Sequence, residues 1–329
     1  MWVIQMREIY RDVILTILLG IVVPALLFYV PYNNEIQMDI PLETTVEYVS
    51  QEVVSHPTIT LLQTDGTVEE IELEEYVLRV VLKEMPASFE SEALKAQAVV
   101  ARTYAVKRLD GNSKHPEASL CVNSQCCQGY CTVEDYLAQG GKADAVDKVR
   151  LAVTDTTNEV ITYENNLIDA TYFSCSGGVT EDAQVVWGKD VPYLQSVESP
   201  GEENAAYFTD TVLIPLGDFQ SLLGQQMKTK PNQWLQDISY TAGGSVETIC
   251  LEDVTYSGTT FRQRLGLRST AFDISITNSG VLIQTRGFGH RVGMSQYGAD
   301  SMAVNGHTYK EILTHYYTGV EITTYSHND

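Results

Sequence analysis

The feature that most constrains this chain is an uncharged apolar segment near its start, VILTILLGIVVPALLFY at residues 13–29. A helix of that length rises by about 1.5 Å per residue and can cross the roughly 30 Å hydrocarbon core of a bilayer. Arg7 and Arg11 come before the segment, whereas acidic side chains follow it. Because such cations favour the cytoplasmic side, the pattern predicts an anchor over residues 1–32, with everything after it outside the cell membrane. A cleaved signal peptide is the alternative, although no small-x-small cleavage site follows Tyr32.

The charge balance narrows the choice of partners. The 329 residues carry 43 acidic and 21 basic side chains, which gives a formal net charge of −22. A chain this acidic repels phosphate backbones, so nucleic acid is not expected as a partner. A polysaccharide fits better, because sugars are bound mainly through hydrogen bonds and stacking faces rather than opposite charge.

The rest of the chain predicts a linker and one mixed domain. Residues 33–57 are acidic and weakly periodic, which is typical of a linker, and the domain is expected over 58–325, with a lobe inserted at about 200–280. Helical and strand-like patterns both occur, so we predict an α+β fold with helices, antiparallel sheets and a substrate groove. The expected strands are 58–62, 68–73, 159–163, 167–173 and 281–287, and the expected helices are 73–85, 91–109, 133–153 with a break at Gly140-Gly141, 261–265, 293–305 and 308–317.

Four motifs in this domain resemble one protein family. They are KEMPASFESEALKAQAVVARTYAVKR at 83–108, YFSCSGGVTE at 172–181, LGLRSTAF at 265–272 and GFGHRVGMSQYGADSMA at 287–303. In this order they resemble stage II sporulation protein D and the related LytB-type domains, over roughly residues 58–320. A transmembrane segment at the start also matches the usual layout of that family.

The resemblance implies an enzyme of the cell wall. It implies a peptidoglycan lytic transglycosylase, a carbon–oxygen lyase that cuts glycan strands and prefers those already stripped of stem peptides. It also implies action in engulfment of the forespore, on the mother-cell side of the septum, beside the sporulation amidase SpoIIP and the membrane protein SpoIIM. The family's catalytic glutamate lies in an E-M-P motif, which here contains Glu84. Position alone would make Glu84 an ordinary charged residue at a helix end, and the motif favours catalysis instead.

A single glutamate is sufficient for this chemistry. Glycoside hydrolases use a second carboxylate as nucleophile or base. In a lytic transglycosylase the C6 hydroxyl of the muramyl sugar attacks the anomeric carbon, so one glutamate donates a proton and then accepts one, leaving a 1,6-anhydro end. Such a group must hold a proton near neutral pH, and apolar neighbours such as Leu82, Met85 and Phe89 would favour the protonated form by desolvation.

The same motifs supply candidate substrate-binding residues. Arg102 would clamp a muramyl carboxylate or form a structural ion pair, and both remain open. The SCSGG strand end would bring hydroxyls and bare backbone close to a sugar, with a simple turn as the alternative. His290 would hydrogen-bond the substrate or serve as a buried structural histidine. The full set is Gln97, Arg102, Tyr104, Tyr172, Ser174, Ser176, Gly177, His290, Gln296 and Tyr297.

A cysteine-rich loop predicts a metal site. His115, Cys121, Cys126 and Cys127 lie in it, and thiolates with imidazole are the ligands that tetrahedral zinc selects. The spacing resembles the H-x5-C-x4-H-C loop with which some family members hold zinc, with Cys126 in place of the second histidine. We therefore expect a structural zinc ion and no cofactor for catalysis. Disulfides, with Cys131 as a further partner, are the alternative for an exported domain.

Two other functional classes remain open. A zinc-dependent amidase or peptidase would use the cysteine and histidine site for catalysis, and it should lose turnover on chelation. A scaffold that only binds the wall would recruit an amidase and leave the glycan uncut. The chemistry of the product ends therefore separates a lyase from a scaffold.

Overall fold

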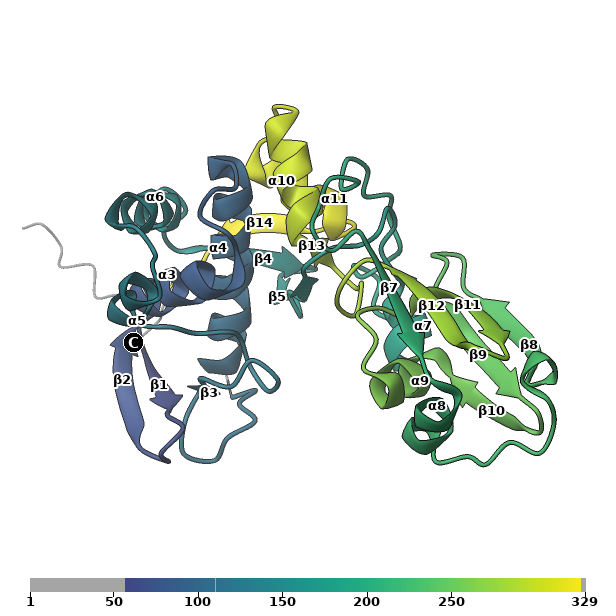
Figure 1. Ribbon diagram of the computed structural model, residues 1–329. Helices are drawn as coiled ribbons and strands as arrows, with labels where there is room; N and C mark the ends of the chain where they lie inside the picture. Colours follow the sequence, from purple (N-terminus) through teal and green to yellow (C-terminus); the bar gives the residue numbers. More distant parts are fainter. Residues whose placement is uncertain (1–56, 110, 327–329) are drawn as a thin grey trace, which may run out of the picture. The chain divides into compact units, whose positions relative to one another are not determined.

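The structure, a computed structural model, describes residues 57–109 and 111–326 (Figure 1). All of these belong to one compact unit. The predicted anchor over 1–32 lies outside the described residues, as does the predicted linker over 33–57 apart from its last residue. No helix in the described part of the chain has both the length and the apolar character to cross a membrane. Helices and mainly antiparallel sheets occur together, so the predicted α+β class is confirmed.

A β-hairpin comes first. Strand β1 (Thr58–Leu62) pairs antiparallel with β2 (Val68–Glu72), and β3 (Leu120–Cys121) pairs parallel with the other edge of β1. The backbone N–H and the hydroxyl of Thr67 both donate to Asp65 and close the turn. The hairpin predicted from the sequence is therefore confirmed.

Helix α4 (Ser91–Leu109) lies at the centre of the first hydrophobic core. Its small side chains, among them Ala98, Ala101 and Ala105, are 0% exposed, which lets neighbouring elements approach closely. Those neighbours are α3 (Leu73–Glu84), α6 (Ala143–Thr154), α10 (Gln296–Val304), α11 (Tyr309–Tyr316) and β4 (Glu159–Tyr163). A short α5 (Val133–Ala138) precedes α6, so the predicted helical break at the glycine pair is also confirmed.

Two small sheets complete this part of the molecule. One has the order β14 (Glu321–Thr324), β4, β5 (Asn166–Leu167), and in the other β6 (Tyr172–Phe173) pairs parallel with β13 (Met294–Ser295). The strand expected over 167–173 was too long, because only its two ends pair. The helix expected from residue 293 starts at Gln296 instead, since Gly293 has a φ of +84° and Ser295 caps the helix by accepting from the Gly298 N–H.

A second hydrophobic core lies in the stretch predicted as an inserted lobe. Phe261 of α9 (Gly258–Leu265) contacts Phe219 of α8 (Leu216–Leu223) and stacks on Phe272. A separate lobe stays a prediction, because the described residues form one unit. The antiparallel sheets have the orders β11 (Ala271–Thr277), β12 (Gly280–Arg286), β7 (Thr209–Ile214) and β10 (Val254–Ser257), β9 (Val246–Leu251), β8 (Leu235–Tyr240), and the shorter helices are α7 (Ala183–Trp187) and η2 (Pro231–Gln233).

Candidate active site

Glu84 stands where two cavities meet. It is the last residue of α3, followed by the C-cap Met85 and by Pro86. The backbone N–H of Gly129 donates a 2.5 Å hydrogen bond to its Oε1. Glu84 lines one cavity of about 750 Å³ and another of about 340 Å³. Ser174 and Gln296 line both cavities as well, so the three side chains lie between the two spaces.

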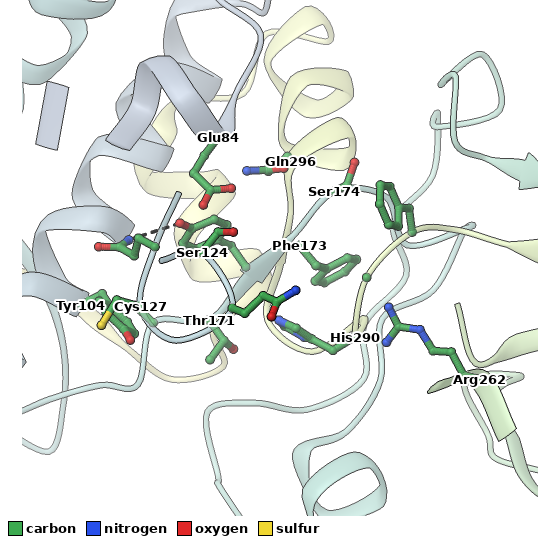
Figure 2. A pocket seen from close by; sticks show the side chains of 16 residues that line it. Glu84, Tyr104, Ser124, Cys127, Thr171, Phe173, Ser174, Arg262, His290 and Gln296 are labelled. Atoms are coloured by element: carbon green, nitrogen blue, oxygen red, sulfur yellow. Dashed lines mark hydrogen bonds between the residues drawn. The ribbon is translucent and has the colours of Figure 1, made fainter. Parts of the chain in front are cut away.

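Segments far apart in the sequence line the larger cavity (Figure 2). They include α4, β6, α9 and the loop between β12 and β13. Its volume lies within the roughly 300–1,000 Å³ range of ligand pockets. The predicted substrate-binding residues that line it are Tyr104, Tyr172, Ser174, His290 and Gln296.

A hydrogen-bonded chain beside Glu84 ends in a protonated tyrosine. The Tyr76 hydroxyl donates to Gln128 Oε1 at 3.1 Å, and Gln128 Nε2 donates to the Tyr172 hydroxyl oxygen at 3.3 Å. Burial raises the pKa of Tyr172 well above its ordinary value, and the nearby Glu84 carboxylate adds to that rise. The Tyr172 hydroxyl therefore keeps its proton at neutral pH and faces Glu84 as a hydrogen-bond donor.

His290 is a neutral donor in the same cavity. Burial, with a smaller effect from the positive charge of Arg262, lowers the pKa of His290 to about 4. The Val292 N–H donates to its Nδ1 at 3.1 Å, so the neutral ring carries its hydrogen on Nε2. The rings of Phe173 and Trp187 pack against it at centroid distances of 5.6 and 5.3 Å. At neutral pH His290 therefore brings no charge to the cavity, and its side chain also hydrogen-bonds the backbone of Tyr172.

Aromatic rings form part of the lining of the smaller cavity. Phe89 and Tyr297 meet edge to face with centroids 5.0 Å apart, and Tyr207 contacts Tyr297 at 6.3 Å. All three line the cavity together with Tyr136. Tyr297 is thus the one predicted substrate-binding residue found only on this side. Ring faces of this kind suit the apolar faces of a sugar.

Two predicted residues on α4 do not line either cavity. Arg102 is 0% exposed and binds Glu74 through two hydrogen bonds, of 2.8 and 2.6 Å. It also donates to the carbonyls of Val153 and Glu159, so the geometry favours the structural ion pair over a substrate clamp. Gln97 is buried too, and its Oε1 accepts from Gln296 Nε2 at 3.4 Å. Gln97 therefore reaches the site only through Gln296.

The SCSGG segment binds a glutamate of the protein itself. Ser176, through both its N–H and its hydroxyl, and the Gly177 N–H donate to Oε2 of Glu202 at 2.7, 2.9 and 3.1 Å. The Cys175 thiol donates to the same oxygen at 3.0 Å. Ser176 and Gly177 thus hold the strand end in place, while Ser174 alone of this segment's predicted residues lines the cavities.

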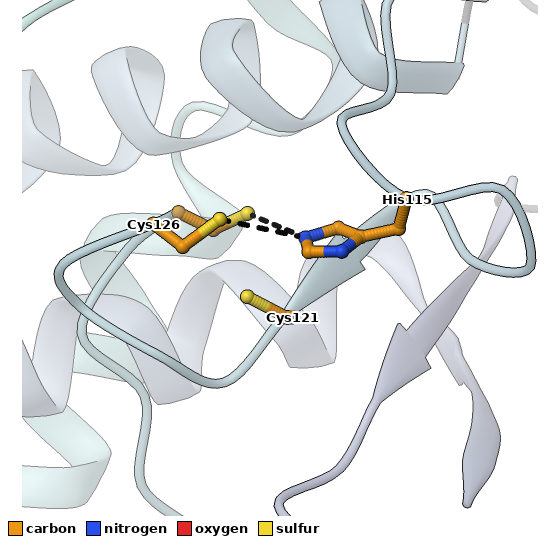
Figure 3. A group of neighbouring side chains, drawn as sticks. His115, Cys121 and Cys126 are labelled. Carbon is orange, nitrogen blue, oxygen red and sulfur yellow. Dashed lines mark hydrogen bonds between the residues drawn. The ribbon is translucent and has the colours of Figure 1, made fainter. Parts of the chain in front are cut away.

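The four predicted metal ligands come together in one cluster (Figure 3). The ligand atoms of His115, Cys121, Cys126 and Cys127 all lie within 4.8 Å of one another, and His115 Nε2 is 3.6 Å from both Cys126 Sγ and Cys127 Sγ. Nitrogen and sulfur ligands bound at about 2.1 and 2.3 Å to one tetrahedral ion are separated by roughly 3.6 Å. All six cysteines are free thiols in this structure, so the donor set fits zinc. Burial raises the pKa of the Cys127 thiol to about 12, and a metal's charge would favour its thiolate.

Comparison with known proteins decides the family. Residues 63–163 match the stage II sporulation protein family. Stage II sporulation protein D of Bacillus amyloliquefaciens is 39% identical over 261 residues, which cover 78% of this chain and 76% of that protein. The protein of the same name from Bacillus subtilis (strain 168) is 39% identical over 262 residues, with the same shares covered. The chain belongs to the stage II sporulation protein D family.

A further relative carries a different name. A protein of Bacillus subtilis (strain 168) named amidase enhancer is 28% identical over 299 residues, which cover 75% of this chain and 40% of that protein. The resemblance read from the four motifs is thus confirmed. This chain therefore belongs to a family of sporulation proteins, and its relatives include one named amidase enhancer.

Three residues of this family member were missed at the sequence level. Gly129 lies two residues after the cysteine pair, a position that suggests a role in the cysteine-rich loop rather than a contact with Glu84. Glu202 is one of 43 acidic residues and lies in no motif. Arg262 precedes the LGLRSTAF motif by a few residues and lines the larger cavity. No pattern in the sequence distinguishes Glu202, because its partners come from three separate segments.

Proposed function

We propose that this member of the family is a lytic transglycosylase that cuts peptidoglycan strands and leaves 1,6-anhydromuramyl ends. One observation carries the proposal: among the described residues that line either cavity, Glu84 is the only carboxylate. A glycoside hydrolase would need a second one. A lytic transglycosylase needs a single group that can act first as acid and then as base.

The surroundings of Glu84 suit both steps. Because Oε1 accepts from the Gly129 N–H, a proton on Glu84 is carried by Oε2. That proton goes to the glycosidic oxygen as the bond to the anomeric carbon breaks. The muramyl C6 hydroxyl then bonds to the anomeric carbon and gives its proton to the Glu84 carboxylate, which restores the acid. Tyr172 and the Gly129 N–H hold the carboxylate in place throughout.

The two cavities give room for sugars on both sides of the cleaved bond. The larger is lined by neutral hydrogen-bonding groups such as Tyr104, Ser174 and His290, and the smaller by the rings of Phe89, Tyr207 and Tyr297. A glycan strand that passes from one cavity into the other would cross Glu84. Strands stripped of stem peptides are the proposed substrate, since they have the least bulk beside the sugars.

The metal cluster is proposed to hold one structural zinc ion. Four protein ligands would complete a tetrahedron and leave no open position for a substrate, which argues against a zinc-dependent amidase or peptidase. Cys127 borders the larger cavity, and Gln128 and Gly129 follow it directly. The ion would therefore fix the segment that hydrogen-bonds Glu84. Removing the metal from folded protein should affect turnover only through this segment.

The setting of the reaction is proposed from the family. The chain would be anchored by residues 1–32 with its domain outside the membrane, on the mother-cell side of the septum. It would act in engulfment with the amidase SpoIIP and the membrane protein SpoIIM. The relative named amidase enhancer supports a working partnership with an amidase. An amidase that strips stem peptides would supply the substrate proposed here.

The decisive test is the chemistry of the ends. Peptide-stripped glycan incubated with the full chain should yield 1,6-anhydromuramyl ends by mass spectrometry. Glu84→Gln should lower the rate about 100- to 10,000-fold while glycan binding persists, and Glu90→Gln, a neighbouring exposed glutamate, should change it little. Reducing ends would show hydrolysis and contradict the proposal. Uncut but bound glycan would favour the scaffold instead.

A further inference from the structure

Arg262 lines the larger cavity. It lies on α9, and its Nε donates to the Leu267 carbonyl at 3.1 Å, which fixes the plane of the guanidinium group. Figure 2 shows that the guanidinium group is directed toward His290. Glu84 lines another part of the same cavity. Since Nε is occupied, the two terminal nitrogens remain for a ligand.

No carboxylate of the described protein neutralises this arginine. The described arginines other than Arg262 and Arg264 each have a carboxylate oxygen within 4.0 Å. Arg264 is exposed, whereas Arg262 is partly buried. Burial alone lowers the pKa of Arg262, without an opposing effect from an acidic neighbour. An unpaired cation in a chain with 43 acidic residues is a costly arrangement that a bound anion would relieve.

Arg262 also supplies the only positive charge among the described residues that line the larger cavity. The neighbouring His290 is neutral, because its pKa is lowered to about 4. The ligand that fills this cavity is therefore expected to carry one anionic group near Arg262 and neutral hydroxyls and amides elsewhere.

We propose that Arg262 recognises the free lactyl carboxylate of a muramyl sugar and so selects strands that have lost their stem peptides. This inference rests on the proposed glycan substrate. A planar carboxylate can accept two parallel hydrogen bonds from the terminal nitrogens of a guanidinium group. When a stem peptide is attached, the same carboxyl group is a neutral amide and a charge-assisted pair is lost. The preference would thus follow from charge as well as from bulk.

The first experiment measures the binding of oligosaccharides, so that its result does not depend on whether the chain cleaves them. The full chain carrying Glu84→Gln is titrated with peptide-stripped oligosaccharides whose lactyl groups are either free carboxylates or methylamides. The carboxylate form should bind about 10- to 100-fold more tightly. Adding Arg262→Gln should remove that difference by weakening the carboxylate form alone. Lys228→Gln, which makes the same change in charge at a side chain 79% exposed and outside the cavity, should preserve it.

Three results would overturn the inference. Equal binding of the two forms by the parent chain would show that the carboxylate is not recognised. An equal loss for both forms on Arg262→Gln would show that Arg262 only supports the fold. Tighter binding of strands with intact stem peptides, lost on Arg262→Gln, would show that a carboxylate of the peptide is the ligand instead.

The inference and the proposed function can fail separately. If the parent chain with Glu84 intact produces anhydro ends at equal rates from carboxylate and methylamide strands, the lyase stands and the role of Arg262 falls. If it produces no anhydro ends, yet Arg262→Gln still removes the preference in binding, the recognition stands and the lyase falls.

Discussion

Glu84 and Glu202 carry the same carboxyl group in different surroundings. Glu84 accepts one backbone hydrogen bond, from Gly129, and lines two cavities. Glu202 is 2% exposed, lines neither, and accepts hydrogen bonds on both oxygens. Its donors are Cys175, Ser176, Gly177, Ser199 and Ser295. Because its lone pairs are engaged, Glu202 stabilises structure, whereas Glu84 keeps an oxygen available for proton exchange.

The two glutamates are nevertheless linked through the lining of the site. Glu202 connects the SCSGG segment after β6 to Ser295 at the start of α10. Ser174 is the first residue of that segment and Gln296 follows Ser295, and both side chains line the two cavities beside Glu84. The buried glutamate thus fixes the walls of the space in which the other would react.

The largest expected effect on stability comes from breaking the buried hydrogen-bond network around Glu202. Glu202→Gln replaces a charged acceptor by an amide whose NH₂ group would face hydroxyl and N–H donors. By analogy with breaking a buried ion pair, we expect the free energy of unfolding to fall by about 3–5 kcal/mol. Thermal or denaturant unfolding of the full chain measures it. Glu203→Gln, at the next residue and exposed, is the matched control and should leave stability unchanged. Equal stabilities for the two variants would show that the network contributes little.

A smaller loss of stability is expected when a residue of the His115–Cys127 cluster, which lies next to the segment that hydrogen-bonds Glu84, is replaced. Cys121→Ser should remove about one zinc ion per chain and lower the free energy of unfolding by about 2–3 kcal/mol, because a ligand that holds the loop is gone. Zinc content by mass spectrometry and thermal unfolding measure the two effects. Cys250→Ser, at a thiol outside the cluster, should change neither. Wild-type protein that binds no zinc under reducing conditions would rule the site out.

Local patterns explain which parts of the fold were predictable. The hairpin at Asp65-Gly66, both helices around the E-M-P motif and the break at Gly140-Gly141 depend on neighbours in sequence, and all match the structure. The clustering of His115, Cys121, Cys126 and Cys127 was also predictable, since these residues share one loop. The strand at 167–173 was overextended because its pairing depends on β13, more than a hundred residues away.

In the candidate site, by contrast, the roles of several residues depend on partners that are distant in the sequence and could not be predicted. Arg102 lies in a motif and has the chemistry of a substrate clamp, yet its partner Glu74 is on another helix and could not be assigned from spacing. Tyr172 and His290 were predicted to bind the substrate and both line the larger cavity, but their protonation could not be read from the sequence because it depends on burial. Gly129 was overlooked because it positions Glu84 through its backbone N–H and through the absence of a side chain.

The smallest expected effect tests how finely Glu84 is placed. A Cβ atom at Gly129 would lie 2.6 Å from Glu84 Oε1, so Gly129→Ala should push the carboxylate aside while the backbone keeps its conformation. We expect turnover of stripped glycan to fall about 10- to 100-fold, or ~1.4–2.7 kcal/mol in barrier, with little change in the unfolding temperature. Gly217→Ala, where a Cβ atom meets nothing within 4 Å, is the control. If Gly129→Ala retained full turnover, the position of the Glu84 carboxylate would not limit the reaction, and a single well-placed acid would no longer account for the site.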